Sequence, residues 1–157
     1  MKWLGRYSGS TKMQPNVSTN ESLTSFVFRP EHVVRKSQPQ TIHPSRLLPR
    51  RNRITQRLET SVCRSTDITE TRIWEICATY FDPHAPKPAI GRGNGPASVT
   101  YAEALHFDAD GIPYAEHANI VGWHDSPNTP DTEQKHFWMN QVQRIAPEFH
   151  YSPRPNW

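Results

Sequence analysis

Proline is the residue that most restricts how this chain can fold. The sequence has 15 prolines in 157 residues, roughly twice the usual share of about 5%. Because proline lacks a backbone N–H and has a fixed φ, it ends helices and is excluded from central strands. Regular structure is therefore expected only between prolines, and a hydrophobic share of 34% predicts a modest core with much irregular chain around it.

The first third of the chain combines a polar segment, a strand and a long connection. Residues 1–22 contain little that can be buried, so we expect a disordered or loosely attached arm. The stretch LTSFVF, residues 23–28, has the composition of a strand. Residues 29–51 contain four prolines and several arginines, which predict a long, irregular, basic N-terminal region.

Alternating hydrophobicity and one turn sequence predict the remaining strands. Residues 53–63 alternate between apolar and polar side chains, which is typical of a half-buried strand. Residues 97–123 are expected to form a hairpin that turns at 108–113. Its turn contains Asp110 and Gly111, a pair that favours tight turns.

Two segments have the apolar spacing of helices. The first helix is expected from about residue 68 to residue 81, with Asp67 as its N-cap. The second is expected to start at Thr129 and to end at Pro147. This order of elements predicts an α+β fold in which two helices pack on a small, mostly antiparallel sheet.

We expect one domain over residues 23–147, followed by an aromatic, proline-rich tail over residues 148–157. No apolar run approaches the roughly 18–20 residues of a membrane span, and the first residues lack the apolar core of a signal peptide. Cys63 and Cys77 have no metal-site spacing and are too few for a disulfide framework. These features predict a cytoplasmic protein without a metal or other cofactor.

Charge is unevenly distributed along the chain. Residues 1–57 hold eleven Lys/Arg and two Glu, a net charge of +9, whereas residues 58–157 have a net charge of −6. Such asymmetry predicts a basic segment that binds something acidic. Nucleic acid, an acidic protein and the chain's own C-terminal half all fit. The arginines expected to bind are Arg46, Arg50, Arg51, Arg53 and Arg57.

Histidines and arginines near the ends of apolar segments are the candidate catalytic residues. His106 and His117 are expected on paired strands, where two imidazoles near a carboxylate can bind a transition metal or act as an acid/base pair. In a phosphodiester hydrolase, His117 would move a proton while Arg64 and Arg92 hold the phosphate. No serine or cysteine lies in a recognised nucleophile motif.

The glycine-rich stretch IGRGNGP, residues 90–96, raises the possibility of a phosphate-binding loop. Such a loop needs a strand before it and a helix after it, so that the helix N-terminus meets the phosphate. Here proline-rich chain precedes the glycines and a strand is expected to follow them. Residues 83–96 are therefore predicted to be a flexible loop, in which the Arg92 guanidinium can still grip an anion.

Several short motifs follow one another along the chain: SFVFRPEHVVR, then ETSVCR, then HANIVGW. In this order they resemble small uncharacterised bacterial proteins with an S-V-x-R segment followed at a distance by H-A-N-I-x-G-W. The resemblance covers about residues 23–145, with Cys63 where an aromatic residue is usual and His124 where proline is usual. It implies a bacterial, cytoplasmic, single-domain protein. It also implies that the positions to test are Ser61, Arg64, Arg92, His117 and Asn119.

Three functions fit these observations. The first is a non-enzymatic binding module whose basic N-terminal half, together with Asn119, binds an acidic partner, either nucleic acid or protein. The second is an accessory subunit of a bacterial multi-protein assembly, with partners encoded by neighbouring genes. The third is a small His/Arg-dependent phosphodiester hydrolase or toxin-like effector. The charge asymmetry favours the binding module, and the hydrolase is the alternative.

Overall fold

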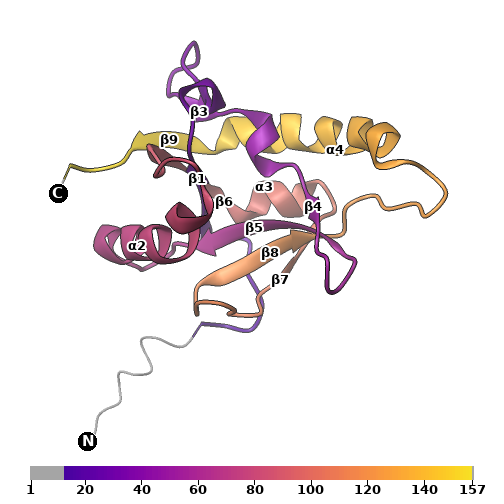
Figure 1. The fold of residues 1–157 in the computed structure, drawn as a ribbon, viewed down its shortest axis with the longest axis horizontal. Coiled ribbons are helices and arrows are strands. Elements are labelled where there is room, and N and C mark those ends of the chain that lie inside the picture. Colours follow the sequence, from indigo (N-terminus) through magenta and orange to yellow (C-terminus); the bar gives the residue numbers. More distant parts are fainter. Residues whose placement is uncertain (1–12, 157) are drawn as a thin grey trace, which may run out of the picture.

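The computed structural model describes residues 13–156, which form a large antiparallel sheet with helices on both faces (Figure 1). Every strand pair is antiparallel, and the short strand β4 (Arg50–Arg51) pairs only with β5 (Leu58–Arg64). The α+β class is confirmed, but the nine-stranded sheet is larger than the small one predicted. In spatial order the other strands are β2 (Val33–Val34), β3 (Thr41–Ile42), β9 (His150–Pro153), β6 (Gly91–Pro96), β1 (Ser22–Val27), β5 (Leu58–Arg64), β8 (His117–Val121) and β7 (His106–Asp108).

Three α-helices accompany the sheet in the described residues. They are α2 (Glu70–Ile76), α3 (Ala97–Ala102) and α4 (Asp131–Ile145). A π-helical turn, η3 (Cys77–Phe81), continues α2, and the short 3₁₀ turns are η1 (Pro30–His32), η2 (Pro44–Leu47), η4 (Asp82–His84) and η5 (Ala146–Glu148). Figure 1 shows α3 beside α4, with α2 in a different part of the molecule. None of the helices in residues 13–156 is both long enough and apolar enough to cross a membrane.

Alternation along the central strands builds two apolar cores on opposite faces of the sheet. Val27 of β1 and Val62 of β5 pack with Val142 of α4 in the larger core. Their sequence neighbours Phe26 and Cys63 point the other way and pack with α2 in the second core. Because successive side chains of a strand point to opposite faces, each face presents its own apolar side chains, and a different helix covers each face. We call these two faces the α4 face and the α2 face.

The two predicted helices are confirmed, with different N-caps. The first helix is capped by Thr69, whose Oγ1 accepts a hydrogen bond from the Arg72 N–H at 3.1 Å. Asp67, the predicted cap, has a positive φ of 62° and lies before it. Pro130 rather than Thr129 occupies the N-cap position of α4. The predicted apolar stripe of α4 is buried and consists of Gln134, Trp138, Val142 and Ile145.

The glycine-rich stretch predicted to be a flexible loop is β6, which lies between β9 and β1 near the middle of the sheet. A Cβ on Gly93 would collide with the Ile42 side chain, and a Cβ on Gly95 would lie 2.7 Å from the Phe149 ring. Glycine here allows close packing of side chains onto the strand, rather than flexibility. The prediction was wrong because glycine has the same sequence signature in both roles.

The sequence predicts a single strand over residues 97–107, but the structure has α3 followed by β7. Ala97 and Thr100 are fully buried and lie about one helical turn apart. The spacing of buried residues in this segment therefore fits a helix, although its short alternation also fits a strand. The predicted hairpin is present in a shorter form, because β7 pairs with β8. Its connection includes Asp110 and Gly111, and the glycine has a φ of +66°.

The strand predicted over residues 53–63 begins only at Leu58. The preceding residues form the turn between β4 and β5, and Ile54, which was expected on the buried face, is 93% exposed. The buried positions Leu58, Thr60 and Val62 are confirmed. Parts of the basic region predicted to be irregular are ordered as β2, β3, β4 and two 3₁₀ turns.

Segments on both sides of the predicted domain pack against it. Residues 1–12 of the expected arm lie outside the described residues. Val17 is buried in the larger core, and the carbonyl of Gln14 accepts a hydrogen bond from the Arg64 guanidinium at 2.7 Å. The tail provides β9, which pairs with β3 on one side and with β6 on the other. Both segments therefore belong structurally to the domain.

Candidate functional site

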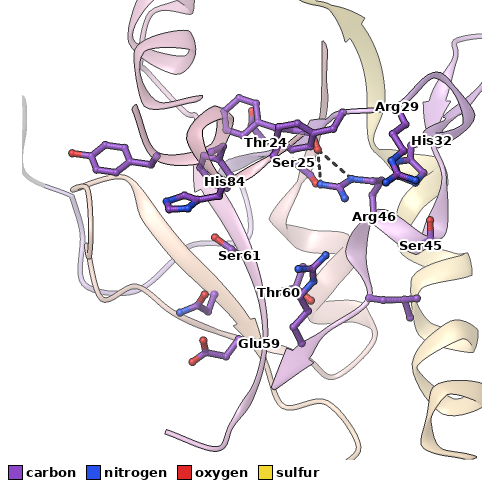
Figure 2. A pocket seen from close by; sticks show the side chains of 18 of the residues that line it. Thr24, Ser25, Arg29, His32, Ser45, Arg46, Glu59, Thr60, Ser61 and His84 are labelled. Carbon is purple, nitrogen blue, oxygen red and sulfur yellow. Dashed lines mark hydrogen bonds between the residues drawn. The ribbon is translucent and has the colours of Figure 1, made fainter. Parts of the chain in front are cut away.

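A cleft of about 620 Å³ opens where the sheet divides (Figure 2). Strand β1 pairs with β5 at only two positions, and further along β5 the short strand β4 takes its place. Figure 2 shows Ser25 of β1, Ser61 of β5 and Arg46 of η2 around this space. The volume lies within the roughly 300–1,000 Å³ of small-molecule sites.

Side chains of η2 and β5 complete the hydrogen bonding where the strands separate. Arg46 donates from Nε and Nη2 to the Phe26 carbonyl, at 3.2 and 2.8 Å. Thr60 donates from Oγ1 to the Leu47 carbonyl at 2.9 Å. These side-chain bonds satisfy backbone carbonyls that a neighbouring strand would otherwise bind. The separation of β1 from β5 is therefore a stable part of the fold.

Three side chains at the edge of the cleft form a continuous hydrogen-bonded relay. Ser61 Oγ lies 2.9 Å from His117 Nε2, and Asp110 Oδ1 lies 2.8 Å from His117 Nδ1. An ionised carboxylate can only accept, so in the neutral imidazole Nδ1 carries the proton and Nε2 accepts from the Ser61 hydroxyl. This is the order of a nucleophile, a general base and an orienting carboxylate.

Strand register explains why these side chains meet. Ser61 on β5 lies directly opposite Asn119 on β8, and His117 lies two residues before Asn119 on the same α2 face. Asp110 comes from the connection between β7 and β8. There the Ile112 N–H donates to its Oδ1 at 3.1 Å, which helps to hold the carboxylate toward His117.

Burial in the relay increases from the serine to the histidine. Ser61 is exposed and lines the cleft, whereas His117 is only 7% exposed and has the Tyr114 ring edge-on at 5.4 Å between centroids. Partial burial by itself raises the pKa of Asp110, but the hydrogen bonds from His117 and the Ile112 N–H outweigh it and lower that pKa. Asp110 is therefore ionised at neutral pH.

The structure separates the two predicted catalytic arginines from His117. Arg64 follows Cys63 along β5 and points to the α4 face, where its buried guanidinium pairs with Glu21 at 2.8 Å. Arg92 lies on the α2 face but on β6, and it is held by Glu70 at the start of α2. The predicted group of His117, Arg64 and Arg92 is therefore not assembled.

Two of the five predicted binding arginines are paired with the chain's own acidic half. Arg51 donates to both carboxylate oxygens of Asp125, at 3.0 and 3.1 Å, and also contacts Asp131 at 3.3 Å. Arg57 contacts Asp108 at 2.6 Å. The third partner considered from the sequence, the C-terminal half itself, accounts for these two side chains.

The other three predicted arginines form no ion pair within residues 13–156. Arg46 and Arg50 line the cleft, and Arg53 lies in the exposed turn between β4 and β5. Asn119 also lines the cleft, and its Nδ2 donates to Asp110 Oδ2 at 3.4 Å. Arg51 lines it as well, so the cleft brings together four of the predicted binding residues.

The other candidate groups lie away from the relay. His106 pairs with Val121 and not with His117, and His124 Nδ1 lies 3.0 Å from Gln134 Oε1. Burial raises the pKa of the Cys63 thiol to about 12, which leaves it protonated and a poor nucleophile. Among the described residues, no group of three or more His, Cys, Asp or Glu is placed to hold a metal ion.

Sequence reasoning did not connect Ser61 and Asp110 with His117. Ser61 is named only through the resemblance, and Asp110 only as a turn residue. The signal that joins them is the pairing register of β5 and β8, which places Ser61 and His117 on one face. The sequence pattern predicts each strand but not which strand it pairs with or in which register, so this contact could not be predicted from it.

Comparison of the chain with protein-family models, with curated proteins and with solved structures finds no match. The resemblance based on S-V-x-R and H-A-N-I-x-G-W therefore stays a prediction. The structure does give the two segments a common place, because residues 61–63 of β5 pair with residues 117–119 of β8.

Proposed function

We propose that the chain is a hydrolase in which Ser61 is the nucleophile, His117 the general base and Asp110 the residue that orients the base. The observation that carries this proposal is the unbroken relay from Ser61 Oγ through His117 to Asp110 at an open cleft. An exposed hydroxyl hydrogen-bonded to a buried, carboxylate-oriented imidazole is the arrangement that activates serine for acyl transfer.

The reaction proceeds through an acyl-enzyme. Ser61 Oγ attacks the carbonyl carbon of an ester while its proton moves to His117 Nε2. The bond to the leaving alkoxide breaks, the alkoxide takes that proton, and Ser61 stays esterified. Water then gives a proton to His117 and attacks the acyl carbon. The acid departs, and Ser61 Oγ takes the proton back from His117.

The backbone N–H of Ser61 and the side-chain amide of Asn119 are available to stabilise the developing oxyanion. The Arg64 N–H donates toward β8, to the Glu116 carbonyl at 2.7 Å. Since N–H groups alternate between the two edges of a strand, the Ser61 N–H points to the other edge, where the cleft opens. The Asn119 side chain lies across from Ser61 and lines the same cleft. Donors so placed stabilise negative charge in the transition state.

Covalent labelling with a fluorophosphonate tests this proposal, because the reagent modifies activated serines. We expect one adduct, on Ser61, and none in Ser61→Ala. In His117→Ala the labelling rate is expected to fall by about 10³-fold or more, since the base is lost. Peptide mass spectrometry locates the adduct, and circular dichroism checks that each variant is folded.

Ser45 supplies a matched control. It lines the same cleft, and its Oγ lies 2.8 Å from His43 Nδ1. In the described residues His43 has no carboxylate partner, so Ser45 forms half of such a relay only. Ser45→Ala should be labelled like the unmodified chain. An adduct on Ser45, or equal labelling rates with and without His117, would overturn the proposal.

A binding function for an acidic partner is the second candidate. It is favoured by Arg46 and Arg50, which line the cleft without a carboxylate partner in the described part of the chain. Titration with a short single-stranded oligonucleotide at two salt concentrations tests the nucleic-acid form, which requires tighter binding at low salt. In this second proposal the chain is a cytoplasmic subunit of a bacterial assembly. Its partners would be encoded by neighbouring genes.

A further inference from the structure

The cleft beside Ser61 is lined by arginines that have no carboxylate partner in the described residues. Arg29, Arg46 and Arg50 line it, and none of them forms an ion pair within residues 13–156. Glu59 is the carboxylate among the lining residues, and it is already bound by Arg57 and Asn52. Figure 2 shows Arg29 and Arg46 close to His32 at one end of this space.

Arg46 carries most of the argument, because its charge is largely buried. Burial lowers the pKa of Arg46, and the charge of Arg50 lowers it further. Its Nε and Nη2 reach the Phe26 carbonyl, which is a dipole and not a counter-ion. A buried charge with no opposing charge is costly, so an anion entering the cleft would relieve the cost.

His32 gives a second, independent observation. Its Nδ1 is buried and has no hydrogen-bond partner in the described residues, although the side chain lines the cleft. Burial lowers the pKa of His32, and the charge of Arg46 adds to this effect, while Glu31 acts in the opposite direction. An unpartnered buried nitrogen beside unpaired arginines marks a place where a hydrogen-bonding ligand fits.

We propose that Arg29, Arg46 and Arg50 form a binding site for a phosphate group in the cleft beside Ser61. Guanidinium groups match phosphate oxygens bidentately, and three arginines from two segments of the chain line this one cleft. The inference rests on the proposed function for its consequence. The ester cleaved at Ser61 is then a small molecule that carries a phosphate group away from the bond that breaks.

A small ligand fits better than a polynucleotide. The cleft volume of about 620 Å³ is that of a small-molecule site. A polynucleotide would need a stripe of free cations extending beyond the cleft, but Arg51 and Arg57 are occupied by Asp125 and Asp108.

Calorimetric titration with inorganic phosphate, at constant ionic strength, tests the site directly. We expect saturable binding of one phosphate to the intact chain. Arg29→Gln and Arg50→Gln should each weaken it by about tenfold, since each loses a charge-assisted hydrogen bond. Both side chains are exposed, so the variants should fold. Arg35→Gln, an exposed arginine outside the cleft, should bind phosphate normally. Equal weakening in Arg35→Gln, or no saturable binding, would overturn the site.

Ser61→Ala separates this inference from the proposed function. The variant keeps all three arginines, so it should bind phosphate as the unmodified chain does. If phosphate binds but Ser61 of the unmodified chain does not react with the fluorophosphonate, the phosphate site stands and the hydrolase proposal fails. If Ser61 reacts but phosphate does not bind, only the phosphate site is rejected. Binding of a ten-nucleotide single strand more than about a hundredfold tighter than phosphate would contradict the small-ligand assignment.

Discussion

Asp110 determines which nitrogen of His117 carries the proton. Its carboxylate accepts from Nδ1, and this leaves Nε2 free to accept from Ser61. In Asp110→Asn the amide can donate to Nδ1 instead, which moves the ring proton to Nε2 and blocks proton transfer from serine. We expect the labelling rate of Ser61 to fall by about 10²–10⁴-fold without loss of the fold.

Asp108 is the matched control for this change. It lies two residues earlier in the same hairpin, but it pairs with Arg57 and not with His117. Asp108→Asn should therefore keep the labelling rate of the unmodified chain. Stopped-flow or timed labelling of both variants at neutral pH makes the comparison. Equal rates in the two variants would show that Asp110 has only a structural role.

The residues of the relay differ in how far the sequence could predict them. His117 could be singled out because it stands at the entrance of an alternating strand. Ser61 could not be joined to it from the residues alone, because they touch across two strands separated by 56 positions in the sequence. The sequence carries Asp110 as a turn residue, and its second role appears only when the turn is folded against His117.

At the scale of elements, β6 depends on glycine for its packing. A methyl group on Gly93 would meet the Ile42 side chain, which is buried in the larger core. Overpacking of this kind costs about 1–3 kcal/mol, so Gly93→Ala should lower the free energy of unfolding by that amount in urea titrations. The loss should be smaller in an Ile42→Ala background, where the methyl group has room. Equal losses in both backgrounds would contradict this contact.

The elements that were predictable are those whose signal lies within one segment. The stripe of α4 repeats over four turns, and β1 has strand composition throughout, so both were identified. Short elements such as β3, β4 and β9 have two to four residues, and their formation depends on a neighbouring strand. The glycines of β6 were misread because their purpose, contact with Ile42 and Phe149, is tertiary.

At the scale of the whole molecule, part of the charge asymmetry is resolved internally. The basic first half supplies Arg51 and Arg57, and the acidic second half supplies their partners Asp125 and Asp108. The sheet interleaves the two halves, since β9 and β6 lie between β3 and β1. The sequence contains the asymmetry itself, but only the folded arrangement shows which arginines are free of an ion pair within residues 13–156.

The same arrangement predicts loss of stability in acid. Arg51 lowers the pKa of Asp125 by hydrogen bonding. Burial by itself raises the pKa of Glu21 and of Glu116, but the hydrogen bonds from Arg64 and Arg72 outweigh it and lower both pKa values. A carboxylate with a lower pKa in the folded state than in the unfolded state stabilises the fold fully above its ordinary pKa. That contribution is lost as the pH falls through the folded-state value.

The midpoint of urea unfolding should therefore stay nearly constant at neutral pH and fall progressively as the pH drops below about 5. Glu21→Gln should be less stable at pH 7, by about 3 kcal/mol, because Arg64 is buried and loses its counter-ion. The variant should also lose less stability on acidification, since one of the titrating groups is gone. Glu148→Gln, at an exposed position without an ion pair in the described residues, should follow the unmodified chain at every pH. If Glu21→Gln instead keeps the full acid dependence, the pairing of Glu21 with Arg64 contributes nothing to it, and the loss in acid arises from the other carboxylates.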